Sequence, residues 1–135
     1  MGSHPRRDSG RAIAYLDTHA AVWLRRGPDW LSERAAEVVE THDLLVSPMV
    51  LFELQYLHEL GRVRDAPEEL LAFLRTSMGV SVCDLPWETV VQAAAQEQWT
   101  RDPFDRLIVA NAKTRGGLLL TSDRHILSHF TGAFC

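Results

Sequence analysis

Short apolar segments alternate along the chain with longer segments of helical character, and this alternation limits the possible folds more than any other feature. The apolar segments are residues 12–16, 44–47, 80–82 and 118–121. They lack the polar alternation of a half-exposed strand, as expected where both faces of a sheet are covered by helices. The pattern therefore predicts the α/β class: three α/β/α layers around a central, mainly parallel sheet of four or five strands. Residues 131–135 are the candidate fifth, edge strand.

The segments between these strands carry helix signals. Ser32 is a candidate N-cap, Pro48 and Pro103 suit first turns, and Gly61 and Gly116 suit helix ends. The predicted helices cover residues 18–24, 33–41, 48–60, 67–76, 87–99 and 103–115, with a short helical turn after residue 123. The polar residues 1–10 are predicted to be a disordered leader and residues 11–135 a single domain. Residues 62–65 form a polar loop for which no function is predicted.

The charge and cysteine content exclude several classes of protein. A net charge of −4 argues against a protein that holds a long duplex through a basic surface, unless cations assist or the contact is small. No apolar run is long enough to span a bilayer, so no membrane partner is expected. Cys83 and Cys135 form no CxxC motif, and we expect free thiols in a reducing cytoplasm.

Two aspartates follow strands that should lie in the same sheet. Asp17 directly ends the first strand, and Asp123 stands just after the fourth. Ligands of open parallel sheets bind beyond the carboxyl ends of the strands, so both positions suit a functional carboxylate. Either residue is equally compatible with a turn or a helix N-cap.

Two further acids lie on apolar helix faces. Glu53 has Met49, Val50 and Leu57 one turn away, and Asp105 is followed by Ile108, Val109 and Ala112. A buried carboxylate must be neutral, paired or bound to a cation. For Glu53 an ion pair with a distant arginine stays open. Asp102 is explained as the N-cap of the helix that contains Asp105, so Asp105 ranks as the functional member, although the reverse ranking stays open.

These four acids should converge on one edge of the sheet. Two like charges about 4 Å apart repel each other by about 4 kcal/mol at an effective dielectric of about 20, and a divalent cation reverses that sign. Ligands that are all oxygen suit Mg²⁺ or Mn²⁺ better than Zn²⁺. Such a site can activate water and stabilise a phosphoryl transition state.

Four segments resemble the PIN-domain proteins, in particular the VapC toxins of bacterial toxin–antitoxin modules. They are YLDTHAAVW (15–23), SPMVLFEL (47–54), RDPFDRLIVANA (101–112) and LLTSDRHI (119–126). The resemblance implies a PIN-like α/β/α fold and a Mg²⁺- or Mn²⁺-dependent endoribonuclease. The catalytic and metal-binding residues it implies are Asp17, Glu53, Asp105 and Asp123, and the supporting ones are Asp102, Thr18, Ser47 and Thr121, with Ser122 as an alternative to Thr121 for orienting Asp123.

The resemblance also implies RNA as the substrate, a homodimer, and inhibition by a cognate antitoxin protein. In the mechanism it suggests, Asp17 and Asp105 bind the principal metal, and water attacks the phosphodiester in line, leaving a 5′-phosphate and a 3′-hydroxyl. Arg106 and Arg124 are candidates for phosphate contact or simply surface arginines. Two rival functions stay open: a Mg-dependent phosphohydrolase with Asp17 as nucleophile, and a PIN-fold module that binds RNA or protein without cutting.

Overall fold

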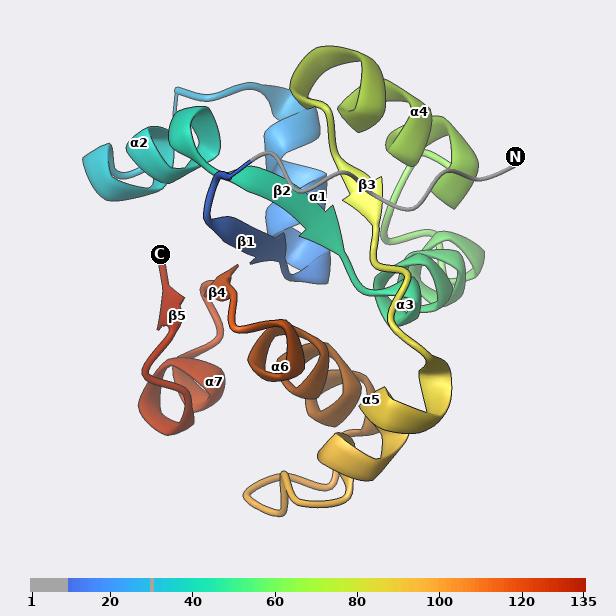
Figure 1. The fold of residues 1–135 in the computed structure, drawn as a ribbon. Helices are drawn as coiled ribbons and strands as arrows, with labels where there is room; N and C mark the ends of the chain where they lie inside the picture. The colour runs from blue at the N-terminus through green and yellow to red at the C-terminus, as the bar shows by residue number, and fades with distance from the viewer. Residues whose placement is uncertain (1–9, 30) are drawn as a thin grey trace, which may run out of the picture.

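The computed structural model describes residues 10–29 and 31–135 and contains a five-stranded sheet whose strand pairs are all parallel (Figure 1). The strand order is β3-β2-β1-β4-β5. The strands are β1 (Ile13–Leu16), β2 (Asp43–Val46), β3 (Ser81–Val82), β4 (Leu118–Leu120) and β5 (Ala133–Phe134). The predicted α/β class and parallel sheet are confirmed, including the C-terminal edge strand. Apart from Gly10, the predicted leader lies outside the described residues.

The helices are divided between the two faces of the sheet by the direction of the crossovers. They are α1 (Thr18–Arg26), α2 (Glu33–Thr41), α3 (Pro48–Glu59), α4 (Pro67–Met78), α5 (Trp87–Ala94), α6 (Pro103–Arg115) and α7 (Arg124–His129). From β1 to β3 the chain moves one way along the sheet, and it then returns to β4 and β5. Right-handed crossovers therefore put α1–α4 on one face and α5–α7 on the other. Figure 1 shows α5, α6 and α7 grouped together, away from α1 and α4.

The core lies on both sides of the central strands. Tyr15 and Leu16 of β1 are fully buried although their side chains point to opposite faces, which explains the uninterrupted apolar run in the sequence. Gly116 ends α6 in the left-handed region at φ 72°, and Gly117 then passes so close to β1 that a Cβ would lie 3.1 Å from the Ile13 carbonyl oxygen. These contacts hold β4 beside β1. The two strand-end aspartates, Asp17 and Asp123, were predicted to meet at this place.

One predicted helix is shorter than expected. Helix α5 ends at Ala94 rather than near Trp99. Arg106 of α6 donates through Nε to the Ala94 carbonyl and through Nη2 to the Ala95 carbonyl, both at 3.2 Å. These bonds satisfy carbonyls that a continuing helix would have used. Arg106 is thus held by the end of α5, and its proposed contact with phosphate is not supported.

The polar neighbours of Glu97 in the sequence predict a solvated side chain, and that prediction is wrong. The side chain is buried and accepts two bonds from Lys113 Nζ, at 2.9 and 3.1 Å, and one from Trp99 Nε1 at 2.8 Å. The local pattern of the sequence does not reveal this pair, because Glu97 and Lys113 lie on different elements. Both cysteines are free, Cys83 buried and Cys135 exposed. None of the helices built from the described residues is long and apolar enough to cross a membrane.

Candidate active site

The predicted acids meet where the strand order of the sheet reverses. Strands β1 and β4 are adjacent, with Leu16 opposite Leu120, and the chain leaves them toward opposite edges. Asp17 follows β1, and its backbone N–H donates to the Leu120 carbonyl at 3.0 Å. This reversal opens a crevice at the carboxyl ends of the two strands, which is the usual ligand site of open α/β sheets.

Thr121 connects the two strand-end aspartates. Its hydroxyl donates to Asp17 Oδ2 at 2.6 Å and accepts from the Asp123 backbone N–H at 3.0 Å, and the residue is fully buried. Asp17 Oδ1 also accepts from the Thr18 N–H at 2.7 Å, which makes Asp17 the N-cap of α1. Thr121 therefore fixes the Asp17 carboxylate directly and Asp123 through its backbone. Ser122, the alternative for this role, is exposed.

Glu53 reaches the site from α3. Its Oε1 accepts a hydrogen bond of 2.5 Å from the hydroxyl of Thr18, which is itself buried. The ion pair with a distant arginine that the sequence left open is absent from the residues the structure describes. The helix face around Glu53 is only partly buried, because Tyr56 is 52% exposed. The carboxylate thus lies at the border of the core, facing a cleft.

Asp102 and Asp105 come from the start of α6. Asp102 Oδ1 accepts from the backbone N–H groups of Phe104, at 2.9 Å, and Asp105, at 3.3 Å, so the predicted N-cap is confirmed. Burial, followed by repulsion from the carboxylates of Asp102, Asp123, Asp17 and Glu53, raises the pKa of Asp105 to about 7. The charge on Asp105 is therefore disfavoured by every other acid of the site.

The same physics acts on Asp17 and Glu53. Burial is the main cause that raises the pKa of the Asp17 carboxyl, while its hydrogen bonds to Thr121 and Thr18 oppose the shift. Burial also raises the pKa of Glu53, partly offset by the bond from Thr18 and reinforced by the charge of Asp17. The site concentrates negative charge that water solvates poorly, and a cation would relieve this cost.

Ser47, which was predicted as a supporting residue, lies at the start of α3. It is fully buried and caps α3, accepting from the Met49 N–H at 3.1 Å, and no hydrogen bond links it to an acid of the site among the described residues. Arg124 is exposed beside Asp123. Ser47 therefore supports the site through the start of α3, the helix that carries Glu53.

The donor set fits a hard cation, although the side chains do not form a closed cage. No three His, Cys, Asp or Glu side chains of the described part are arranged to hold one ion together. Asp102 and Asp123 each use Oδ1 for their helix caps, at α6 and α7, which leaves Oδ2 for a ligand. Glu53 keeps Oε2 in the same way. Carboxylate oxygens with room for water are the ligands that Mg²⁺ and Mn²⁺ prefer.

A cleft of about 670 Å³ opens beside the acids and contains residues that the sequence did not single out. Glu53 and Asp102 line it together with the aromatic residues Trp23, Tyr56 and Phe104. His19 follows Asp17 closely in the sequence, which suggests that it borders the site, and it also lines this cleft. The exposed Tyr56 ring stacks on Phe104 with centroids 6.2 Å apart. The apolar face of α3 is thus partly a wall of the cleft. Hydrophobic periodicity alone does not distinguish a cleft wall from a helix face buried in the core.

The comparisons with known proteins agree on one family. Residues 14–131 match the family model of the PIN domain. Ribonuclease VapC22 of Mycobacterium tuberculosis is 34% identical over 121 residues, which cover 84% of this chain and 89% of that protein. VapBC2 from Rickettsia felis, bound to a DNA fragment from its promoter, has a TM-score of 0.64 at 16% identity and covers 90% of this chain and 96% of its own. DNA-bound VapBC from Salmonella typhimurium has a TM-score of 0.59 at 22% identity and covers 92% and 99%.

Proposed function

The chain belongs to the PIN-domain family, in its VapC ribonuclease branch, and on that premise we propose that it is a divalent-metal-dependent endoribonuclease toxin. One observation carries the proposal. Five carboxylates gather at the strand ends, and none of them has an arginine or lysine partner among the described residues. They are Asp17, Glu53, Asp102, Asp105 and Asp123. A structural role would have been met by ion pairs, whereas this arrangement calls for a cation.

The residues that would hold the Mg²⁺ or Mn²⁺ ion are Asp17, Glu53, Asp105 and Asp123. When bound, the ion neutralises charge on the phosphate and acts as a Lewis acid toward its oxygens. Asp17 is fixed by two hydrogen bonds and supplies a rigid anchor. Glu53 is held by Thr18, so the two acids keep their separation when substrate enters.

Asp105 gains most from a bound cation, because burial and all four of the other acids disfavour its charge. We propose that water attacks the phosphodiester in line and gives its proton to the carboxylate cluster. The products would carry a 5′-phosphate and a 3′-hydroxyl.

The partners follow from the family. VapBC2 from Rickettsia felis and a toxin–antitoxin complex from Klebsiella pneumoniae share the fold. We propose that this chain is likewise held inactive by a cognate antitoxin, and that it forms a homodimer. Trp87 and Val91 of α5, both nearly half exposed, offer an apolar surface for such contacts. A cytoplasmic location remains part of the proposal.

The test compares Asp17→Asn with Glu37→Gln, a matched loss of one charge on the exposed surface of α2. Asparagine keeps a side-chain oxygen for the α1 cap, so the fold should persist by circular dichroism. We expect the wild type and Glu37→Gln to cleave RNA with Mn²⁺ and to stop with EDTA, and Asp17→Asn to be inactive. Mapping the 5′ ends of the fragments checks the products.

Two results would replace the proposal by a rival. Hydrolysis of small phosphomonoesters without RNA cleavage would indicate a phosphohydrolase. RNA binding without cleavage, in any divalent metal, would indicate a module that does not cut. Full activity of Asp17→Asn, with co-purifying nucleases excluded, would remove the acid cluster from the mechanism.

A further inference from the structure

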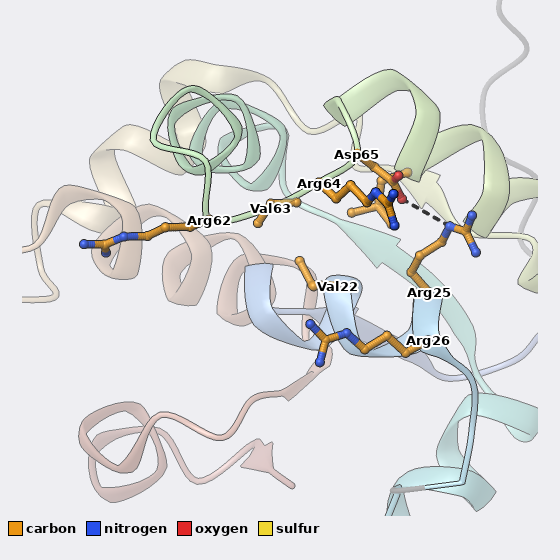
Figure 2. A pocket seen from close by; sticks show the side chains of 8 residues that line it. Val22, Arg25, Arg26, Arg62, Val63, Arg64 and Asp65 are labelled. Atoms are coloured by element: carbon orange, nitrogen blue, oxygen red, sulfur yellow. Dashed lines mark hydrogen bonds and ion pairs between the residues drawn. The ribbon is translucent and has the colours of Figure 1, made fainter.

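A second cavity, of about 690 Å³, lies between the last turn of α1 and the loop that joins α3 to α4. Figure 2 shows Arg25 and Arg26 on α1 across from Arg64 and Asp65 on that loop, whereas the side chain of Arg62, at the start of the loop, extends away from Arg25 and Asp65. Four of the fourteen basic residues of the chain thus line a single cavity in a protein of net charge −4. Local sequence pattern does not predict this grouping, because the loop is separated from α1 by more than thirty positions.

Within the described part of the chain, Arg25 alone among these four arginines has a carboxylate partner. Arg25 Nε lies 3.2 Å from Asp65 Oδ2, and its guanidinium lies over the Phe73 ring, 4.2 Å from the centroid. Figure 2 shows this ion pair as a dashed line. Arg26, Arg62 and Arg64 have no carboxylate partner among the described residues. Among the residues that the structure describes, the cavity therefore keeps three positive charges without a carboxylate partner, beside the Arg25–Asp65 ion pair.

The cavity lined by Arg25, Arg26, Arg62 and Arg64 (the basic cavity) is continuous with the cleft that contains Glu53 and Asp102 (the acid cleft). Arg26 and Arg62 line both, as do Val22 and Val63. Since the acid cleft also contains Glu53, the path from the carboxylates to the arginines is one lined surface. A polyanion that reaches the carboxylates is repelled there, and unpaired positive charge beside the cleft offsets this cost.

From this continuity we propose that Arg26, Arg62 and Arg64 bind the phosphates of single-stranded RNA next to the phosphodiester that is cut. The inference rests on the proposed function and deepens it. Guanidinium groups match phosphate oxygens in a planar, two-pronged geometry. The half-exposed ring of Tyr56 in the adjoining cleft is a side chain of the kind on which unpaired bases stack.

The rival occupant is an acidic segment of a protein partner. Such a segment would also bind arginines, but it would gain nothing from the continuity with a cleft that is lined by Glu53 and Asp102. An RNA strand gains from both, because its phosphates run through the basic cavity and into the acid site. The geometry therefore favours RNA, and the acidic segment is an outcome of the test.

The test measures binding without catalysis. A fluorescein-labelled single-stranded RNA of mixed sequence is titrated with the full chain in EDTA, at several salt concentrations. The variants are Arg26→Gln and Arg62→Gln/Arg64→Gln, and the control is Arg75→Gln, an exposed arginine on α4 that lines neither cavity. Each lost phosphate contact should weaken binding about three- to tenfold. It should also lower the slope of log K against log salt by about 0.7.

The outcomes separate this inference from the proposed function. Equal affinities and slopes in all the proteins, or no binding by any of them, overturn it, whether or not RNA is cleaved. Loss of RNA affinity in the cavity variants alone supports it, even if the wild type proves unable to cut. A further titration uses polyglutamate as probe. If the variants lose polyglutamate binding and keep RNA binding, the cavity is an acidic-protein site and the RNA assignment is wrong.

Discussion

Removing the charge of Asp105 should make the metal-free protein more stable at neutral pH. Its carboxyl lies among four other acids, and burial together with their repulsion raises its pKa to about 7. In the unfolded chain the same group titrates near its ordinary value of 3.8. Between these values the native state binds a proton that the unfolded state releases, so the free energy of unfolding falls as the pH rises. Asp105→Asn abolishes that loss.

The size of the effect follows from the two pKa values. A difference of about three pKa units corresponds to about 4 kcal/mol if fully expressed. The Asp105 side chain is partly exposed, so solvent screening reduces the figure, and we expect about 1–2 kcal/mol. The gain should be small near pH 4, where the native group is protonated and the unfolded group is only partly ionised, and complete above about pH 8.

The assay is urea unfolding in EDTA near pH 4.5 and pH 8, for the wild type, Asp105→Asn and the surface control Glu37→Gln. The difference in the free energy of unfolding should appear only for Asp105→Asn, and it should be several-fold larger at pH 8 than at pH 4.5. Adding Mn²⁺ should stabilise the wild type and shrink the difference. If Asp105→Asn is equally or less stable at both pH values, the carboxylates do not repel each other as inferred.

Three further changes test side-chain contacts that hold the site and the helices around it in place. Thr121→Val removes the hydroxyl bonded to buried Asp17 and should cost about 1–3 kcal/mol by thermal unfolding. It should also reduce RNA cleavage more than tenfold. Arg106→Gln should increase amide exchange at the end of α5, because two carbonyls lose their donor, and should leave RNA affinity unchanged. Lys113→Met should destabilise the fold by about 2–4 kcal/mol in urea, since buried Glu97 loses its partner, and adding Glu97→Gln should recover much of it.

The sequence predicted the sheet well because its signals are local. Each strand is a short apolar run, and Pro48, Pro103 and Gly116 mark helix ends by their own backbone preferences. The sequence-based prediction was wrong for the end of α5, where Arg106 of α6 donates hydrogen bonds to backbone carbonyls of α5. No property of the residues around Ala94 encodes that contact. Helix ends determined by tertiary contacts are therefore beyond a reading of local pattern.

For the site, local pattern identified the acids and missed their surroundings. Glu53 and Asp105 stood out because a carboxylate among apolar helix neighbours needs an explanation. The cleft residues Trp23, Tyr56 and Arg62 did not, since aromatic side chains and loop arginines occur on most surfaces. Their grouping depends on how α1 packs against α3, which involves contacts between distant parts of the chain. Long-range proximity is what the single sequence does not provide.

The alternatives of helix cap and functional acid, which the sequence left open for Asp17, Asp102 and Asp123, are compatible. All three are N-caps, and each places its carboxylate at the positive end of a helix dipole, where the negative charge is stabilised. A cap needs one oxygen, and Asp102 and Asp123 each use only Oδ1 for it. The capping bond fixes the direction of the free oxygen before any ligand arrives. The helix starts therefore organise the acids at one edge of the sheet, so the local structure and the chemistry of the site have a common origin.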